Sequence, residues 1–206
     1  MGSNPSNFNS DPMNPVEQVS WEDVVNEFLP RLNALVPGLE AGLPSEAQWE
    51  YACRSGSHMP FSFGRNITPD QVNFDGNYPY ANGPKGQFRE RTVPVASLPA
   101  NAWGLYEMHG NVYEWCSDWY GKYSGNSVGG PEEGADRVLR GGSWFDGARF
   151  CRSAFRFRVV PGFRIDYFGF RLAPGRASRA GTARPAEPAV EDMGTRSGSR
   201  DATRTS

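Results

Sequence analysis

Apolar residues at helical spacing near the N-terminus predict a first helix. They recur at intervals of three and four residues, which places them on one side of a helix. The stripe consists of Val24, Val25, Phe28 and Leu32. Ser20 precedes it as a suitable N-cap, because a serine hydroxyl accepts a hydrogen bond from the first turn. Pro30 lacks an amide hydrogen, so we expect it to end or kink this helix.

A second helix is predicted within LPSEAQWEYACRSG, residues 43–56. Ser45 can cap it, and Glu46 occupies the first turn, where a negative charge is favourable. The expected inner face consists of Trp49, Tyr51 and Ala52. Gly56 should end the helix, because glycine readily adopts the left-handed conformation that follows many helices.

The rest of the chain predicts loops followed by short strands. Residues 56–134 are dense in Gly, Pro, Asn and Asp, and such long irregular stretches are ordered only where packing, a metal or function holds them. AFRFRVV (154–160) alternates in part and GFRLA (169–173) is largely apolar, so both are expected to be strands. Residues 175–206 contain almost no large apolar side chains, which predicts a disordered tail.

Length and composition restrict the class of protein. With 206 residues the chain is long enough for one domain with a core. A net charge of −2 gives no field that would favour nucleic acid, and no apolar run is long enough to span a membrane. Three cysteines without a CxxC pair argue against a disulfide scaffold or structural zinc. The N-terminus lacks the features of a secretion signal, so the default expectation is a cytoplasmic or phage-associated protein.

Several motifs occur in the order found in one known family. They are NPVEQVSWEDV (14–24), LPSEAQWEYACRSG (43–56), FSFG (61–64), LPANAWGLYEMHGNVYEWCSDWY (98–120), RVLRGGSW (137–144) and GFRLA (169–173). Together they resemble the formylglycine-generating, sulfatase-modifying domain. The resemblance implies an α+β variant of the C-type lectin fold over residues 1–174, with two helices, little regular structure and a twisted antiparallel sheet. Because the family domain begins with further strands upstream of SNPSNF (3–8), we expect a domain that is short at its N-terminus.

The resemblance also bears on catalysis. Family members that oxidise a substrate cysteine to formylglycine bind copper(I) through two cysteines of the final segment. The second corresponds to Cys151, but the first, five residues earlier, corresponds to Asp146. A carboxylate is a poor substitute for a thiolate on copper(I), so we expect no copper and no oxidase activity. The iron-dependent sulfoxide synthases of a related branch need several histidines, whereas only His58 and His109 are present.

The segment 137–171 is rich in Phe and Arg, and six of the chain's 13 Phe fall between Phe145 and Phe168. Its frame of GGSW, CRSA and GFR motifs is similar to the variable region of diversity-generating retroelement proteins. In those systems template adenines are misread, so Asn codons become almost any codon ending in a pyrimidine, and none of these encodes Lys, Glu, Gln, Met or Trp. The positions between the frame residues contain none of the five types. They are Phe145, Asp146, Gly147, Phe150, Phe155, Phe157, Arg158, Val159, Val160, Gly162, Phe163, Ile165, Asp166, Tyr167 and Phe168.

We interpret these positions as an exposed face that binds a protein ligand. Aromatic side chains with Arg and Asp nearby are typical of protein-binding surfaces. The frame arginines, such as Arg156, Arg164 and Arg171, are expected to pair with acidic residues elsewhere and hold the backbone. The alternative is that the Phe side chains form the core, but so many buried Arg and Asp would be costly. Phe170, with Phe150 or Phe155, is expected to belong to the core.

The resemblance further implies structural calcium. One ligand set maps onto Glu107, Gly110, Val112 and Glu114, with carboxylates at either end and backbone carbonyls between. A second set would use Asn73 and Phe74 with Gln87 and Arg89. Gln87 replaces an acidic ligand there. The alternative for the first set is that Glu114 only accepts backbone hydrogen bonds.

The sequence therefore predicts a non-enzymatic binding protein with a diversified face. Two alternatives remain open at this point. One is an active formylglycine-generating or related oxidase, and the other is a structural or regulatory domain of the same family without diversification.

Overall fold

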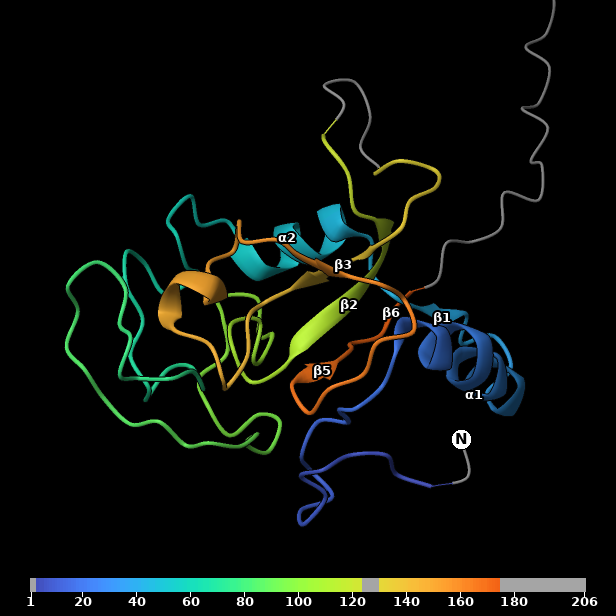
Figure 1. Ribbon diagram of the computed structural model, residues 1–206, viewed down its shortest axis with the longest axis horizontal. Helices are drawn as coiled ribbons and strands as arrows, with labels where there is room; N and C mark the ends of the chain where they lie inside the picture. Colours follow the sequence, from blue (N-terminus) through green and yellow to red (C-terminus); the bar gives the residue numbers. More distant parts are fainter. Residues whose placement is uncertain (1–2, 124–129, 175–206) are drawn as a thin grey trace, which may run out of the picture.

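The computed structural model describes residues 3–123 and 130–174. In this part of the chain, long irregular segments join two helices and a small sheet (Figure 1). The helical segments are η1 (Asp23–Phe28), α1 (Leu29–Leu35), α2 (Glu46–Arg54) and η2 (Ala148–Cys151). The strands are β1 (Ala41–Gly42), β2 (Tyr113–Trp119), β3 (Arg137–Arg140), β4 (Phe157–Val159), β5 (Phe168–Gly169) and β6 (Ala173–Pro174). The tail predicted over 175–206 lies outside the described residues, and no helix among those described is long and apolar enough to cross a bilayer.

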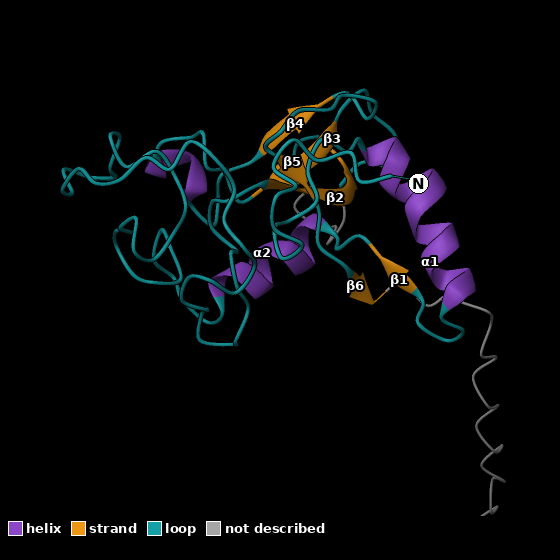
Figure 2. Cartoon of the chain, turned by 90° about the horizontal axis from the view of Figure 1, so that it is seen from below, coloured by secondary structure: helices purple, strands orange, loops and turns teal. Residues whose placement is uncertain are grey.

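The main sheet has four strands in the order β4-β3-β2-β5. β3 pairs antiparallel with β2 and with β4, whereas β5 runs parallel to β2. The predicted α+β class is therefore confirmed, with one parallel pair in a mainly antiparallel sheet. β1 and β6 form a separate antiparallel ladder near α1. Figure 2 shows α1 at one end of the sheet and the irregular loops, with η2, at the other.

The first predicted helix forms, and Pro30 does not end it. Helical structure covers 21–35, with Pro30 early in α1 and a π-helical stretch, η1, directly before it. A proline ring collides with the carbonyl four residues earlier in a regular helix, and the wider π-helical turn gives that ring room. Ser20 caps the helix as predicted, since its hydroxyl accepts a hydrogen bond from the Asp23 amide at 3.1 Å.

The second helix begins where the sequence indicates, but one of its inner residues is different. Ser45 and Gln48 form a reciprocal capping box at its start. Trp49 is buried, whereas Tyr51 is 70% exposed, so the prediction that Tyr51 faces the core is wrong. Two positions along a helix rotate a side chain by about 200°. Cys53, one turn after Trp49, takes the inner position instead.

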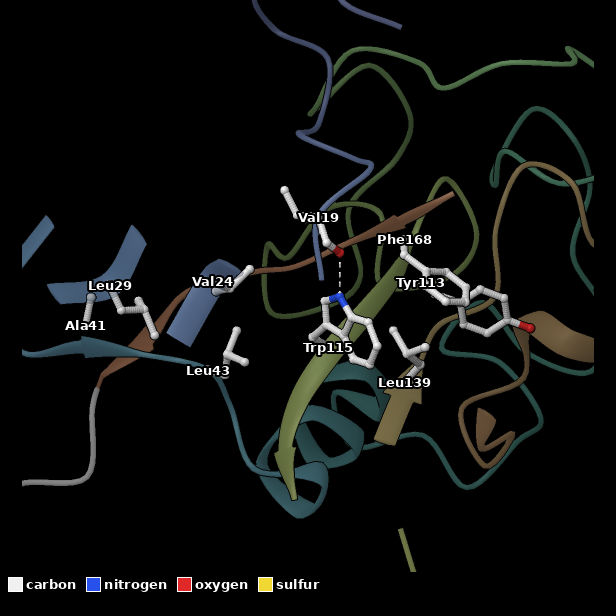
Figure 3. Close-up of a cluster of buried hydrophobic side chains, with 9 residues drawn as sticks. All are labelled: Val19, Val24, Leu29, Ala41, Leu43, Tyr113, Trp115, Leu139 and Phe168. Atoms are coloured by element: carbon white, nitrogen blue, oxygen red, sulfur yellow. Dashed lines mark hydrogen bonds between the residues drawn. The ribbon is translucent and has the colours of Figure 1, made fainter. Parts of the chain in front are cut away.

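The main core joins segments from both ends of the chain (Figure 3). Its buried members are Val19, Val24, Leu29, Ala41, Leu43, Tyr113, Trp115, Leu139 and Phe168. The Trp115 indole donates a hydrogen bond to the Val19 carbonyl at 2.9 Å, which ties β2 to the segment before the first helix. Burial of one such side chain contributes about 1.5–3 kcal/mol. The cluster therefore fixes β5, and with it the backbone of the Phe-rich segment.

Packing also orders the irregular middle of the chain. One cluster there consists of Phe61, Ile67, Val72, Phe74, Ala148 and Cys151. It holds η2 against the loops. The strands expected near the C-terminal end are shorter than predicted: AFRFRVV contributes only β4, and GFRLA is divided between β5 and β6.

Candidate ligand-binding face

Arginine–carboxylate pairs attach the last segment to the body of the domain. Arg156 contacts Glu46 at the start of α2, with Nε–Oε1 and Nη2–Oε2 distances of 2.5 and 2.7 Å. Arg171 contacts Glu114 of β2 in the same two-pronged way, at 2.6 and 2.7 Å. Bidentate pairs of this kind fix geometry as well as add energy. The prediction that frame arginines pair with acidic residues elsewhere is confirmed at these positions.

Arg164 makes a third such pair with Asp23 of η1, where its Nε lies 2.6 Å from Oδ2. The hydrogen bonds from Arg164 lower the pKa of the Asp23 carboxyl group to about 2. Because the Arg164 side chain is 56% exposed, solvent screens the attraction and the pair adds little stability. Its effect is to position the turn that carries residues 160–165.

A buried charged network lies beneath this segment. The Arg140 side chain is fully buried and contacts Glu46 at 3.4 Å, the carboxylate of Glu50 and the carbonyl of Phe155. Glu46 also binds Arg156, so one carboxylate joins α2 to β3 and to the segment 144–171. Removal of one partner from such a network leaves a buried charge without compensation and costs about 3–5 kcal/mol.

The fifteen predicted ligand-contacting positions divide into three groups by exposure. Exposed are Phe145, Phe157, Arg158, Val160, Gly162 and Phe163. Half-buried are Asp146, Phe150, Phe155, Val159, Ile165, Asp166 and Tyr167. Buried are Gly147 and Phe168. Among the exposed apolar side chains, Phe145 is 57% exposed, Val160 52% and Phe163 43%.

Phe168 belongs to the core, and its assignment to the exposed face is wrong. It is 1% exposed and lies in β5 beside Tyr113 and Trp115, with ring centroids 5.8 and 5.6 Å away (Figure 3). The pairing of β5 with β2 brings this side chain over the main core. Phe157 and Phe163 contact the same ring at 6.0 and 5.9 Å. Phe168 is therefore the base on which two exposed rings lie.

Gly147 is the second assignment that the structure contradicts. A Cβ atom added there would lie 2.7 Å from the Cβ of Tyr78 and 3.2 Å from the Tyr78 carbonyl oxygen. Two backbone hydrogen bonds clamp these segments together, from Ala148 to Tyr78 at 3.0 Å and from Asp75 to Asp146 at 2.9 Å. Position 147 therefore has no room for a side chain that could contact a ligand.

Around the exposed Phe145 ring, an aromatic cluster extends beyond the predicted positions to buried and half-buried rings. Phe145 stacks on Tyr167 at 5.6 Å with 8° between the ring planes. Trp144 lies 5.6 Å from Phe145, and it also contacts Phe8 at 5.5 Å and Phe88 at 6.2 Å. Sequence reasoning missed Phe8 and Phe88, because a single Phe in a polar loop belongs to no periodic pattern.

Phe150 and Phe155 form a pair of their own near η2. Their ring centroids are 5.1 Å apart, and the Arg149 guanidinium lies 4.7 Å from the Phe150 ring. Phe155 and Phe170 both pack against the main core although they are partly buried. The expectation that Phe170 and one of this pair support the core is thus confirmed.

At the two positions that would hold copper(I), the structure places one carboxylate and one buried thiol. Asp146 accepts hydrogen bonds from the hydroxyl groups of Ser143 and Tyr113, and burial raises the pKa of this carboxyl group. Figure 3 shows the Tyr113 hydroxyl pointing away from the core cluster. Cys151 is fully buried, which holds its pKa well above the ordinary value. A thiol kept protonated in this way is a poor nucleophile and a poor metal ligand.

A second thiol lies close to a histidine but is also inert. Cys53 Sγ is 3.6 Å from His109 Nε2, and both side chains are buried. Burial raises the pKa of Cys53 to about 12 and lowers that of His109 to about 4. Both groups are therefore neutral near pH 7, and no thiolate–imidazolium pair forms for nucleophilic catalysis.

In the first predicted calcium set, Glu107 and Glu114 have different surroundings. Glu107 Oε1 is buried and has no hydrogen-bond partner among the described residues, which is a suitable environment for a hard cation. Both oxygens of Glu114 are engaged by Arg171, and Oε2 also accepts a hydrogen bond from the Trp49 indole. Within this set, one oxygen of Glu107 is thus available for a cation, whereas the Glu114 carboxylate is already occupied by Arg171 and Trp49.

The second predicted calcium set offers one similar oxygen. Asn73 Oδ1 is buried without a partner in the described part of the chain, while its amide nitrogen donates to the Arg91 carbonyl and to Asn111. Phe74 is buried beside it in the chain. Gln87 and Arg89 line a groove, and Asn73 is not among the residues that line it.

The family and structural relatives agree with this architecture. The model of the sulfatase-modifying factor enzyme 1-like domain matches residues 1–175. Treponema denticola variable protein 1 is a similar solved structure, with a TM-score of 0.67 and 28% identity, covering 84% of this chain and 77% of that one. PvdO from Pseudomonas aeruginosa has a TM-score of 0.67 and 34% identity, covering 79% of this chain and 62% of that one. These likenesses confirm the predicted fold class.

Sequence relatives include a formylglycine-generating enzyme, an inactive counterpart and a protein kinase. The formylglycine-generating enzyme of Bos taurus is 34% identical over 174 residues, 79% of this chain and 44% of the relative. The inactive C-alpha-formylglycine-generating enzyme 2 of Bos taurus is 31% identical over 171 residues, 78% of this chain and 50% of the relative. The serine/threonine-protein kinase pkn1 of Chlamydia caviae is 40% identical over 141 residues, 65% of this chain and 21% of the relative. The chain thus spans half or less of each of these relatives. From the ordered motifs, the shared fold and the match over residues 1–175, we conclude that the chain belongs to the sulfatase-modifying factor enzyme 1-like domain family.

Proposed function

We propose that this protein is a non-enzymatic binding protein whose exposed face is diversified by a retroelement and binds a protein ligand. The observation that supports the proposal is that two kinds of residue alternate within residues 144–171. Arginines of the frame hold the backbone, and the positions between them present side chains to solvent. The proposed contact residues are Phe145, Phe157, Arg158, Val160, Gly162 and Phe163, with Phe150, Phe155, Val159, Ile165, Asp166 and Tyr167 around them.

The chemistry of this face suits a protein surface. Exposed aromatic rings provide a large contact area and lose little side-chain entropy when they become ordered. Phe157 and Phe163 already rest on the buried Phe168 ring, so binding immobilises them at little further entropic cost. The ion pairs of Arg156 and Arg164 fix the backbone on both sides of β4 before any ligand arrives. A surface prepared in this way spends less of its interaction energy on ordering.

The alternative of an oxidase is disfavoured by the two copper(I) positions. Asp146 supplies a hard oxygen ligand that is already hydrogen-bonded, and Cys151 supplies a thiol that burial keeps protonated. An inactive relative exists in the same family. Purified protein, loaded with copper(I) and given a cysteine-containing substrate peptide and oxygen, is expected to form no formylglycine by mass spectrometry. Turnover under conditions in which an active family member converts the same peptide would overturn the non-enzymatic assignment.

A genomic comparison tests the diversification directly. We expect a reverse transcriptase gene close by and a near-copy of the codons for residues 144–171. The copy should differ mainly at adenines, and the differences should include the codons for Phe145, Phe157 and Phe163. The codons for Gly147 and Phe168 should match the copy, because the fold restricts both positions. A copy that differs at random bases, or at buried codons as often as at exposed ones, contradicts diversification of this face.

We also propose a structural role for calcium at the buried oxygens of Glu107 and Asn73. Both oxygens are shielded from solvent and lack partners in the described part of the chain, which is costly unless a cation or another donor satisfies them. A cation bound at either oxygen would add a further link to loops that packing and hydrogen bonds already hold. The effect of calcium on thermal unfolding tests this role.

A further inference from the structure

A buried carboxyl group lies where the N-terminal loop meets the C-terminal segment. Glu17 is 0% exposed, and its Oε1 accepts a hydrogen bond from the Phe8 amide at 2.7 Å. Its Oε2 has no hydrogen-bond partner in residues 3–123 and 130–174, and no ion pair of these residues includes Glu17. Burial without an opposite charge favours the protonated form of a carboxyl group, because the charged form loses its hydration.

Backbone contacts join Glu17 to the last part of the proposed face. Glu17 forms an antiparallel β-bridge with Gly169, and the amide of Gln18 donates a hydrogen bond to the Ile165 carbonyl at 3.1 Å. The stretch 165–169, which includes proposed contact residues, therefore runs directly beside the buried carboxyl group.

A second connection runs through aromatic side chains. Phe8, whose amide binds Glu17, packs edge-on against Trp144 with ring centroids 5.5 Å apart. The Trp144 indole donates a hydrogen bond to the Asp166 carbonyl at 3.3 Å, and its ring lies 5.6 Å from that of Phe145. A displacement of the Phe8 backbone therefore reaches the exposed Phe145 ring through one intervening side chain.

The charge of Glu17 changes in the neutral pH range. Burial raises the pKa of this carboxyl group to about 7, the hydrogen bond from the Phe8 amide opposes that rise, and the charge of Asp166 adds to it. As the pH rises through this value, Glu17 becomes a buried anion that Asp166 repels. Among the described residues, Asp166 is the charged group that acts on it. Asp166 is half-buried and belongs to the proposed contact residues.

We propose that Glu17 makes the binding face sensitive to pH, so that the face is well ordered at mildly acidic pH and loosens at mildly alkaline pH. Ionisation of Glu17 weakens its packing against the N-terminal loop and against residues 165–169, and the contact between Phe8 and Trp144 passes the change to Phe145. Position 166 lies within the segment proposed to be diversified, so the residue there sets the pH of the change. The importance of this response for ligand binding rests on the proposed function, whereas the response itself is a property of the fold.

An NMR titration of the isotopically labelled full chain tests the coupling without any ligand. It is carried out in EDTA from about pH 5 to about pH 8.5, so that the range extends well to either side of the pKa of Glu17. The signals are the Glu17 side-chain carboxyl carbon, the Phe8 amide and the Trp144 indole N–H, which is identified by its loss in Trp144→Phe. We expect all three to follow one transition with a midpoint near pH 7. The Trp49 indole, which binds Glu114 elsewhere in the domain, should not follow it.

Matched variants assign the transition to its cause. In Glu17→Gln the transitions of Phe8 and Trp144 should disappear. Asp166→Asn removes the repelling charge and should lower the midpoint by about half a pH unit. Asp11→Asn removes an exposed carboxylate from the N-terminal loop and should leave the midpoint unchanged. Thermal unfolding checks that each variant is folded, and Asp166→Asn carries the test alone if the buried substitution unfolds the domain.

Two results would contradict the proposal. A Trp144 transition that persists in Glu17→Gln, or a Glu17 transition that Phe8 and Trp144 do not follow, overturns the coupling of this carboxyl group to the face. An unchanged midpoint in Asp166→Asn overturns the assignment of position 166 as the residue that sets the pH. Neither result bears on diversification, which the genomic comparison tests separately, so failure of one proposal is distinguishable from failure of the other.

Discussion

Gly147→Ala is expected to destabilise the domain, whereas Gly162→Ala is expected to be nearly neutral. Both glycines lie between frame residues of the Phe-rich segment, and neither has a positive φ. Gly147 has φ −69° and ψ 158°, which an alanine adopts without strain. The difference between the two positions is therefore steric. The new Cβ at 147 would lie 2.7 Å from the Cβ of Tyr78, but at 162 it would meet only the flexible carboxylate tip of Glu22 at 3.3 Å.

The size of the destabilisation by Gly147→Ala depends on which atoms must move to make room for the new methyl group. Insertion of a methyl group into a packed contact costs about 1–3 kcal/mol. If the loop around Tyr78 moved away from residue 147 to avoid the clash, the hydrogen bonds from Ala148 to Tyr78 and from Asp75 to Asp146 would lengthen. Each of these bonds contributes about 1 kcal/mol. We therefore expect a loss of about 2–3 kcal/mol. For a domain of this size that corresponds to a decrease in Tm of about 4–12 °C.

Thermal unfolding followed by circular dichroism measures both variants against the parent protein. Tyr78→Gly removes the opposing Cβ, so in the Gly147→Ala background it should recover part of the lost stability. If Gly147→Ala has the same Tm as the parent protein and Gly162→Ala, the loop around Tyr78 moves aside without loss of stability. Position 147 would then be open to diversification, and its exclusion from the face would be wrong.

Three further predictions concern buried groups. Burial raises the pKa of Glu17 from 4.5 to about 7, so the folded state keeps a proton that the unfolded state releases. The unfolding free energy should therefore fall by up to about 3 kcal/mol as the pH rises from 4.5 to 7. Urea unfolding of Glu17→Gln over this range should show a smaller dependence on pH. If the pH dependence is unchanged in the variant, other groups cause it. Addition of calcium after EDTA treatment should raise Tm, because a hundredfold excess over Kd adds about 2.7 kcal/mol to the unfolding free energy. If calcium raises Tm no more than a magnesium control does, calcium has no structural role here. Phe168→Ala should cost about 3–5 kcal/mol in urea unfolding, and Phe163→Ala, at a 43% exposed ring, about 1 kcal/mol or less; similar losses would mean that both rings belong to the core.

Local signals in the sequence predicted the elements that depend on local chemistry. Ser20 and Ser45 cap helices where their spacing to the following apolar residues indicates. Trp49 is buried as its motif predicts. Tyr51 lies two residues after Trp49 and points away from the core, whereas Cys53, one turn after Trp49, is buried. Helical geometry alone would have selected Cys53, which shows that angular position outweighs residue size.

Long-range pairing could not be predicted in the same way. Phe163 and Phe168 are identical side chains five residues apart, yet one is 43% exposed and the other 1%. The difference arises because β5 pairs in parallel with β2, more than fifty residues earlier in the chain. Phe8 and Phe88 join the aromatic cluster through their contacts with Trp144, and these contacts bring three separate loops together. No periodicity in the sequence carries information of this kind.

If residues 144–171 are diversified as we propose, some of these residues must hold the backbone while others present side chains to a ligand. Arg156 and Arg164 attach the backbone through carboxylates of the first and second helical regions, so changes at Phe157 or Phe163 alter the surface and leave these attachments intact. Phe168 has both roles, because it supports the exposed rings and fills the core. A random residue there would remove the base of the face together with part of the core. Under the proposed function, diversity is therefore useful only where the fold leaves the side chain at least partly exposed, which includes Phe145, Phe150, Phe155, β4, the 160–165 turn and Tyr167 and excludes Gly147 and Phe168.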